Sequence, residues 1–428
     1  MLLRRMVAFA VVALMLALAG RSDGQPLQKI KVMTRAGSNF TKGTEVAAIE
    51  FTKRTGIQVE IVEVGRAGYF ATLTTRFSGA DSEMDLGWMV SPNMAKYAAA
   101  GGLEPLDKYV ADPKLTPADW DAKDFLTKCD YAGKTYMYPV FVGTEYTYYR
   151  KDLMSKPPET WDEYLEMAKK FTKALNPSSP TLYGAVWPNK SPEELQRTFM
   201  TVVFSSGGYV YDEAKKTVGL DEPAAIRAGE TYAKFVKARL LPVDAMNYAF
   251  TEITDGLKAG KFAIAAPMWD NAFLQIRTSD SPFKDMIEVA PVPGFKQPDG
   301  SIKSSAMQQS WGLVINSQSK NKEAAYKFLN FMQSKEIQRI IFEQAGLNPP
   351  RASVLNDPRF LGKPGSAHFK LLAQVLANSH ALPSITWLPE LEEKLGPRLG
   401  DILTGAAAPA DALKSAAADI RKLASQNP

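Results

Sequence analysis

Apolar positions in the first hundred residues recur with two different periods. In segment 57–64 (IQVEIVEV) apolar and polar residues alternate except at the adjacent pair 61–62, which predicts a half-buried strand, and 29–34 has the pattern of a strand as well. Between them, 41–53 has helical spacing and ends at Gly56, a residue that commonly terminates helices. Further elements follow in the same order: a helix at 68–77, a strand at 84–90 and a helix at 92–100. This alternation predicts a three-layer α/β lobe with a mostly parallel sheet.

A second set of elements follows a long aromatic segment, 136–149, which is extended enough to pass from one lobe into another. A strand at 310–316 predicts a return to the first lobe. The elements predicted after the crossing are helices at 160–173, 192–206, 223–239 and 321–333, strands at 261–268 and 287–292, and a helical region at 389–423 broken at 405–409. Because a chain of 428 residues exceeds what one hydrophobic core supports, two α/β lobes are expected.

The N-terminus has the pattern of an export signal. Arg4 and Arg5 precede an uncharged apolar stretch, 7–19, and Ala17-Leu18-Ala19 supplies small residues for cleavage. Thirteen apolar residues are fewer than the ~20 that span a membrane. The stretch resembles the start of a lipoprotein signal, but Arg21 stands where the lipidated cysteine would be. We therefore expect 1–19 to be a cleaved signal peptide and the exported product, periplasmic or associated with the cell surface, to carry no lipid.

Composition narrows the function by exclusion. Apolar residues make up 45% and charged residues 23% of the chain, both ordinary for a soluble protein. The net charge is 51 − 46 = +5, and about +3 without the two arginines of the signal, which is too weak to indicate a nucleic-acid partner. One cysteine, Cys129, and two histidines leave no disulfide and no zinc-type ligand cluster. We expect no metal and no cofactor.

An ordered set of short motifs resembles the family-1 extracellular solute-binding proteins of bacterial ABC importers, the maltose-binding type. The motifs span most of 29–423, and their order carries the resemblance more than any one of them. They are EFTKRTGIQV at 50–59, AGGLEPL at 100–106, GKTYMYP at 133–139 with YYRKDL at 148–153 and PETWDE at 158–163, GKFA at 260–263 with Met268-Trp269, SKNKEAA at 319–325, and LTG at 403–405 with DAL at 411–413.

The resemblance implies a type II periplasmic-binding-protein architecture, in which two lobes are joined by crossing hinge strands and ligand lies between them. We assign 25–144 plus 310–350 to lobe one, and 145–309 plus 351–428 to lobe two. It also implies a non-catalytic, monomeric receptor that binds a carbohydrate, closes, and delivers it to the transmembrane subunits of an ABC permease.

Sugars present C–H faces that stack on aromatic rings and hydroxyl edges that need fixed polar partners. Trp269 and Asp270 follow a predicted strand end, where α/β proteins bind ligands, and the resemblance also places a stacking aromatic there. Glu145 lies on the crossing strand, where a buried carboxylate must be paired or bound. Gln309, Trp311 and Gly312 lie at the predicted return.

Further candidates follow the other predicted strands. They are Ser38 and Asn39 after the first strand, Arg66 and Tyr69 after the second, Trp88 and Asn93 at the third, Arg351 at the return to lobe two, and Trp387 before the last helices. Each has a structural alternative: helix capping for Ser38 and Asn39, core packing for the tryptophans, and a surface or hinge ion pair for the charged residues.

Other functions stay open. The same receptor could carry a polyamine, which would need several carboxylates at the site, or a glycerophosphodiester, which would need extra cationic groups. An exported glycosidase with paired carboxylates is a third possibility. The chain has no Gly-x-Ser-x-Gly, His-Glu-x-x-His or Cys-His pattern that would favour another hydrolase. The aromatic and amide candidates favour a neutral polyol, and several separated tryptophans favour a di- or oligosaccharide.

Overall fold

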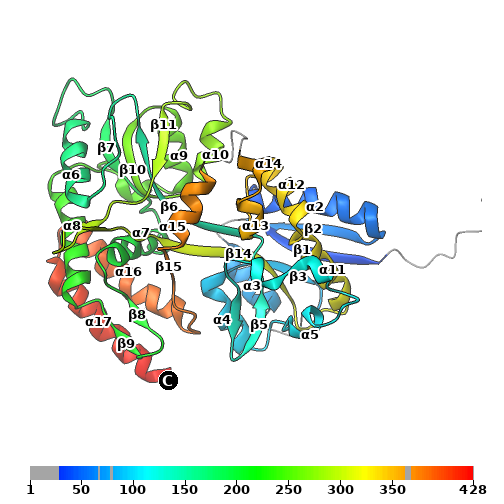
Figure 1. The fold of residues 1–428 in the computed structure, drawn as a ribbon. Helices are drawn as coiled ribbons and strands as arrows, with labels where there is room; N and C mark the ends of the chain where they lie inside the picture. The colour runs from blue at the N-terminus through cyan, green and yellow to red at the C-terminus, as the bar shows by residue number, and fades with distance from the viewer. Residues whose placement is uncertain (1–27, 66–67, 78–80, 362–367, 428) are drawn as a thin grey trace, which may run out of the picture.

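The computed structural model describes residues 28–65, 68–77, 81–361 and 368–427 (Figure 1). The proposed signal peptide at 1–19 and the candidate Arg66 lie outside the described residues. Helices and strands are interleaved along the chain, and the long strands form one continuous hydrogen-bonded sheet in the order β2-β1-β3-β14-β6-β10-β7. The predicted α/β class is confirmed.

Lobe one is built on four of these strands. β1 (Lys29–Arg35) is parallel to β2 (Gln58–Val64) and β3 (Leu86–Val90), and β14 (Met307–Ile315) is antiparallel to β3. Helices α2 (Asn39–Thr55), α3 (Tyr69–Phe77), α11 (Lys322–Met332) and α12 (Lys335–Ala345) pack around them. α2 begins where the Ser38 hydroxyl accepts from the Thr41 N–H and ends at Gly56, whose φ of 76° is the left-handed conformation that glycine adopts without strain.

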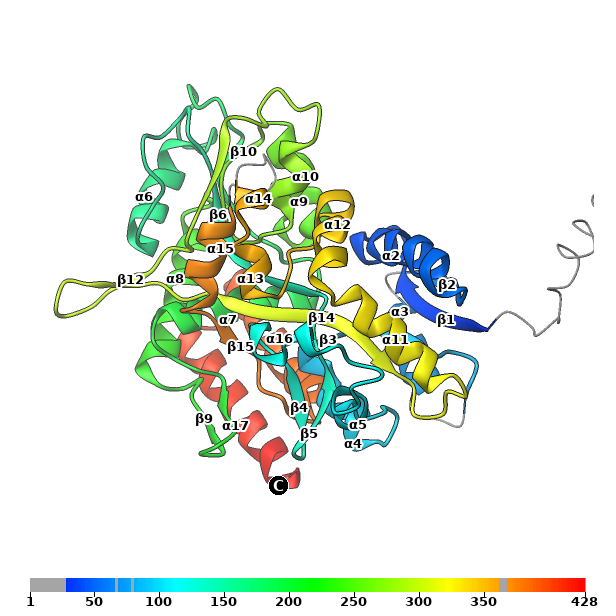
Figure 2. The same cartoon turned by 45° about the vertical axis from the view of Figure 1, so that its right-hand side comes forward.

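Lobe two is built on β6 (Phe141–Arg150), β10 (Phe262–Trp269), β7 (Tyr183–Val186) and β11 (Ile287–Ala290). β10 is parallel to β7 and antiparallel to β6, while β11 pairs with β6 from the other side. The surrounding helices are α6 (Trp161–Lys170), α7 (Pro192–Ser205), α8 (Pro223–Lys237), α9 (Phe250–Lys258), α10 (Ala272–Arg277), α15 (Phe369–Leu376), α16 (Leu388–Thr404) and α17 (Pro409–Gln426). α17 packs along α16 and ends at the C-terminus (Figure 2).

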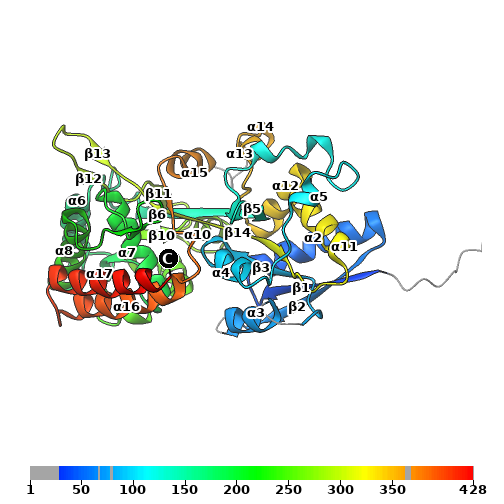
Figure 3. The ribbon, with the colours of Figure 1, turned by 90° about the horizontal axis from the view of Figure 1, so that it is seen from below.

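The two lobes are joined by β6 and β14, which run side by side from one into the other (Figure 3). Two predicted boundaries are corrected here. The expected single strand at 136–149 divides into β5 (Lys134–Met137), paired with β4 (Cys129–Tyr131), and β6. Pro139 lies in the break and has no N–H for a sheet ladder. The return strand begins at Met307 rather than Ser310, because Gln308 and Gln309 also pair with β6.

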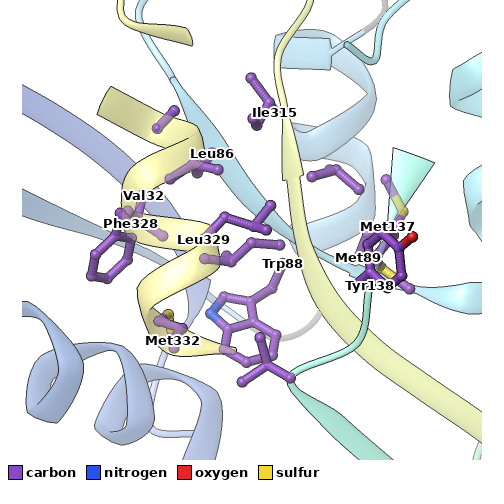
Figure 4. Packing of buried hydrophobic residues seen from close by; sticks show 14 of the residues in the cluster. Val32, Leu86, Trp88, Met89, Met137, Tyr138, Ile315, Phe328, Leu329 and Met332 are labelled. Carbon is purple, nitrogen blue, oxygen red and sulfur yellow. The ribbon is translucent and has the colours of Figure 1, made fainter. Parts of the chain in front are cut away.

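Separate hydrophobic clusters stabilise the two lobes. The lobe-one cluster contains Trp88, Phe328 and Leu329 and extends from Ile30 to Phe141 and from Trp311 to Leu347 (Figure 4). Two further clusters lie in lobe two, one including Trp161 and Trp387 and the other including Tyr146 and Phe369. The lobe boundaries at 144/145, 309/310 and 350/351 stay predictions, since hydrogen-bonded strands run through the first two without interruption.

Candidate functional site

β6 and β14 pair side by side where they pass from one lobe to the other, and this place is called the β6–β14 crossing. The carboxyl ends of parallel strands from both lobes meet there. Trp269 at the end of β10 is the register partner of Glu145, and Val90 at the end of β3 is the partner of Trp311, which itself pairs with Phe141. From Glu145 to Phe141 along β6 is four residues, about 13 Å. The strand ends of the two lobes are therefore separated by roughly the length of a small ligand, at the kind of edge where α/β sheets bind.

Three hydrogen bonds lie at the crossing itself, two made by Thr201 and one by Arg197. The Thr201 hydroxyl, on α7, donates to Glu145 Oε2 and accepts from the Met307 N–H at 2.9 Å. One turn earlier on the same helix, Arg197 Nη1 donates to Gln309 Oε1 at 3.1 Å. Helix α7 thus forms hydrogen bonds with a carboxylate of β6 and with an amide of β14 at the β6–β14 crossing. Glu145, Gln309 and the two α7 residues are buried.

Burial controls the ionisation of the two acidic candidates. Glu145 is fully buried, and the resulting loss of hydration raises its pKa to about 8, against the opposing effects of Thr201 and Arg197. Burial raises the pKa of Asp270 to about 8 in the same way, although Asn348 donates to its Oδ2 at 2.6 Å. Both carboxyl groups therefore have a large neutral fraction near pH 7. Glu145 Oε1 and Asp270 Oδ1 have no hydrogen-bond partner among the described residues.

Trp269 differs from the other aromatic candidates because it is only half buried. It follows the apolar run of β10, and its carbonyl accepts from the Tyr148 hydroxyl at 2.8 Å. That bond fixes the backbone while part of the indole remains accessible. Among the tryptophans singled out from the sequence, it is the one whose exposure in this conformation suits ligand stacking.

On the lobe-one side, Phe40 covers two aromatic candidates. Its ring stacks on Trp88 and on Trp311, with centroids 4.7 Å apart in each pair. The Arg35 guanidinium lies 5.4 Å from the centroid of the Trp311 ring and 5.9 Å from that of Phe70. Phe40, Phe70 and Arg35 are half buried, so they, and not Trp88, offer accessible surface beside the crossing.

The lobes also approach each other on both sides of the crossing. On one side, Gly346 lies close both to Asn39 and to Leu274 of α10 in lobe two. A Cβ built on Gly346 would be 3.7 Å from Asn39 Nδ2 and 2.6 Å from Leu274 Cδ2. On the other, the 3₁₀ turn that contains Asn93 packs against α16, and Lys96 pairs with Glu390 at 3.7 Å. Asn39 and Asn93 are half buried at these two approaches. Ser38 caps α2 and also donates to the Arg35 carbonyl at 2.6 Å.

Several sequence candidates lie within the protein core instead. Tyr69 is buried, and its hydroxyl donates to the Trp88 carbonyl at 2.7 Å. Trp88 is buried as well, and its indole Nε1 donates to Thr44 Oγ1 at 2.9 Å. Trp387 packs edge-on against Tyr211 inside lobe two. Core packing, the alternative expected for the tryptophans, describes the environment of Trp88 and Trp387, and Tyr69 is buried in the same way.

Gly312 and Arg351 also have environments different from those expected. A Cβ on Gly312 would lie 2.6 Å from the Tyr138 carbonyl oxygen, so this glycine allows close packing within lobe one and not approach of a ligand. Arg351 is completely buried and donates from Nε to the Gln333 carbonyl at 2.8 Å. The sequence predicted Arg351 either at the surface or in contact with the ligand, but its side chain is buried and bonds to the backbone of another segment.

Arg197, Thr201, Phe40 and Asn348 were not among the residues expected at the site. A signal for the first two exists in the sequence: they are four residues apart on a predicted helix, which places them on one face. Phe40 and Asn348 carry no such local signal, because their roles depend on partners distant in the sequence. Among the described residues no three His, Cys, Asp or Glu side chains are placed to hold a metal ion.

Residues 34–339 match the bacterial extracellular solute-binding protein family. The chain belongs to this family. As members are extracellular receptors of ABC importers, the predicted family resemblance and the exported, solute-binding role are confirmed. In the described part of this solute-binding protein, no helix combines the length and apolar character needed to cross a membrane.

Named relatives bind sugars and polyols. The solute-binding protein is 26% identical over 281 residues to the maltotriose-binding protein of Pyrococcus abyssi, a match that covers 63% of this chain and 55% of that protein. Maltose-bound MalE3 of T. maritima is 25% identical, with a TM-score of 0.79 over 92% of this chain and 99% of the other. A ribitol complex of an ABC transporter solute-binding protein from Agrobacterium radiobacter has a TM-score of 0.80 at 23% identity, covering 93% and 100% of the two chains, and shows the shared type II fold.

Proposed function

We propose that this protein captures a carbohydrate, a di- or oligosaccharide, between its two lobes and delivers it to the transmembrane subunits of an ABC permease without altering it chemically. The observation that carries the proposal is the pairing of half-buried Trp269 with Glu145 at the point where strand ends of both lobes meet. An aromatic face beside fixed polar groups suits a sugar ring and its hydroxyls. The names of the maltotriose-binding and maltose-bound relatives support this class of ligand.

The electrostatics of the site favour a neutral ligand. A polyamine would need ionised carboxylates, but burial raises the pKa of Glu145 and of Asp270 to about 8, and Arg197 adds positive charge beside Glu145. A glycerophosphodiester would need several cationic donors, whereas Arg197 is the cation described at the crossing and its Nη1 already donates to Gln309 Oε1. Hydroxyl groups can both donate to and accept from such neutral or partly ionised acids, so a polyol is accommodated in either protonation state.

A thermal-shift screen of the purified mature chain tests the proposal. Ligands would be mono-, di- and oligosaccharides, with spermidine and glycerophosphocholine as representatives of the alternatives. A ligand that binds only the folded state stabilises it by about 2.7 kcal/mol at a hundredfold excess over Kd. We expect a shift with a di- or oligosaccharide. A shift with spermidine or glycerophosphocholine alone would overturn the sugar assignment, and recovery of shortened sugar after incubation would support a glycosidase instead.

A further inference from the structure

An ion pair joins the two lobes on the flank of the β6–β14 crossing where Asn93 lies. Lys96 of α4 (Met94–Ala99), in lobe one, has its Nζ 3.7 Å from Glu390 Oε1 of α16, in lobe two. The 3₁₀ turn Ser91–Asn93, which directly precedes α4, packs against α16. Within the described part of the chain, neither Lys96 nor Glu390 forms another ion pair. Each of these two charges therefore has the other as its compensating partner.

Lys96 is fixed to lobe one by the rest of its helix. Met94 and Tyr97 are buried in the lobe-one hydrophobic cluster. The Tyr97 hydroxyl also lies 2.8 Å from Thr74 Oγ1 of α3, a hydrogen-bond distance. Because its neighbours on both sides are anchored in this way, Lys96 moves with lobe one.

Glu390 is fixed to lobe two in a similar way. Leu388 and Leu391, on either side of it in α16, are fully buried in the core of lobe two. The side-chain amide of Gln196, on α7, donates to the carbonyl of Glu392 in the same helical turn. The first turn of α16 therefore moves with lobe two, and the Lys96–Glu390 ion pair connects two bodies that the crossing strands allow to rotate.

Rotation about the crossing changes the distance between Lys96 and Glu390 because they belong to different lobes. The 3₁₀ turn already packs against α16 and blocks a closer approach, so rotation away from this conformation separates the charges. Each of the two side chains is 43% exposed, so dissolved salt can screen the pair. On the opposite flank, Gly346 approaches the apolar side chain of Leu274, a contact that involves no charge.

Two other ion pairs cross the proposed boundary at 350/351 but lie at the chain connection itself. Arg351 pairs with Asp124, and Asp357 pairs with Arg339 of α12. α13 (Ala352–Leu355), which lies between Arg351 and Asp357 in the sequence, packs against α12. These pairs therefore join the connecting segment to the helix beside it, whereas Lys96 and Glu390 join the bodies of the two lobes.

We propose that the Lys96–Glu390 ion pair is a salt-sensitive latch that favours the conformation with the lobes in contact, in the protein without ligand. A partly exposed ion pair contributes modestly, so it should change the ratio of contacting to separated lobes by about two- to fivefold. A change of that size shifts the populations most when the two conformations are similar in free energy. The proposal does not depend on the sugar assignment, because it concerns the lobes before any solute binds.

Single-molecule energy transfer between dyes on the two lobes measures this ratio. The dyes are attached through Lys53→Cys in lobe one and Lys173→Cys in lobe two, both at exposed positions. The native Cys129 is buried, so the dyes should react with the two introduced thiols. When NaCl is raised from about 0.02 to about 0.5 M, we expect the ratio of contacting to separated lobes to fall about two- to fivefold.

Charge variants distinguish the latch from a general effect of salt. Lys96→Glu should lower the ratio about fivefold or more at low salt, and added salt should then raise the ratio by screening the repulsion from Glu390. The double variant Lys96→Glu/Glu390→Lys should recover most of the wild-type ratio. Lys327→Glu is the matched control, because it breaks an ion pair with Glu323 inside α11 of lobe one and should leave the ratio unchanged.

Two outcomes would overturn the latch: a ratio that does not change with salt in the wild type, or equal ratios for the wild type and Lys96→Glu at low salt. If the double variant behaved like Lys96→Glu, the loss would come from packing at position 96 and the electrostatic role would be wrong. A decrease in Lys327→Glu as large as in Lys96→Glu would likewise show an effect of net charge and not of this pair.

Discussion

Asn348 Nδ2 donates to Asp270 Oδ2 at 2.6 Å, which ties the segment following α12 to the carboxyl end of β10 in lobe two. The same amide contacts His368 through its Oδ1, 3.1 Å from the imidazole Nε2. One asparagine therefore links three elements that are distant in the sequence. All three side chains are buried, so each polar group depends on the others for its hydrogen bonds.

Replacing this asparagine should destabilise the protein. Asn348→Leu keeps a similar volume but removes the donor to buried Asp270, which should lower the free energy of unfolding by about 1–3 kcal/mol. Urea denaturation measures the change. Asn356→Leu is the matched control, because Asn356 is exposed and its side chain bonds only within its own helical turn. A loss of the same size in both variants would contradict the role assigned to Asn348.

Asp270 should make stability depend on pH. Because burial raises its pKa from 3.8 to about 8, the folded state holds a proton that the unfolded state has lost between these values. Its contribution is fully present below about pH 4 and is lost as the pH rises to about 8, at no more than about 1.4 kcal/mol per pH unit. Unfolding free energies measured from pH 5 to 8 should fall less steeply in Asp270→Asn than in wild type. Asp280→Asn, at an exposed aspartate, should leave the slope unchanged.

Trp269→Ala tests the proposed stacking. Loss of the ring should weaken sugar binding by about 2 kcal/mol or more, in the range of buried aromatic anchors, while the protein stays folded. Isothermal titration with the sugar identified by the thermal-shift screen measures the affinity, and circular dichroism checks the fold. Tyr183→Ala, at the amino end of β7 and far from the crossing, is the control. Unchanged affinity in folded Trp269→Ala would assign the indole to packing.

Ligand binding should close the two lobes. A sugar that contacts Trp269 in lobe two and Asn39 or Asn93 in lobe one favours the closed state through its greater affinity for it. Small-angle scattering should then show a smaller radius of gyration at saturating sugar, and a smaller decrease in Trp269→Ala. Identical scattering with and without tightly bound sugar would count against closure, provided that the free protein is shown not to be closed already.

The mature protein should begin near Gly20 and carry no lipid, because Arg21 offers no thiol for acylation. N-terminal sequencing and intact mass of the protein exported by its native host measure both features. An added acyl mass, or retention of 1–19, would contradict the prediction.

The order and type of the elements follow from the sequence because they depend on neighbours in the chain. Ser38 and Gly56 delimit α2, Thr160 accepts from the Glu163 N–H at the start of α6, and the break at 405–409 separates α16 from α17. Capping and periodicity act over a few residues, so the α/β class and the family motifs were readable without a structure.

Only the tertiary structure decided which candidates have accessible surface beside the crossing. Trp269 ends β10 and Trp88 lies two residues before the end of β3, yet Phe40 stacks on Trp88, which is buried, while Trp269 stays half exposed. Arg351 was expected at the surface or on the ligand, but Arg197 is the arginine at the crossing, because α7 packs over β14. Burial is set by elements that pack together from distant parts of the chain, and no local pattern of apolar and polar residues records that packing.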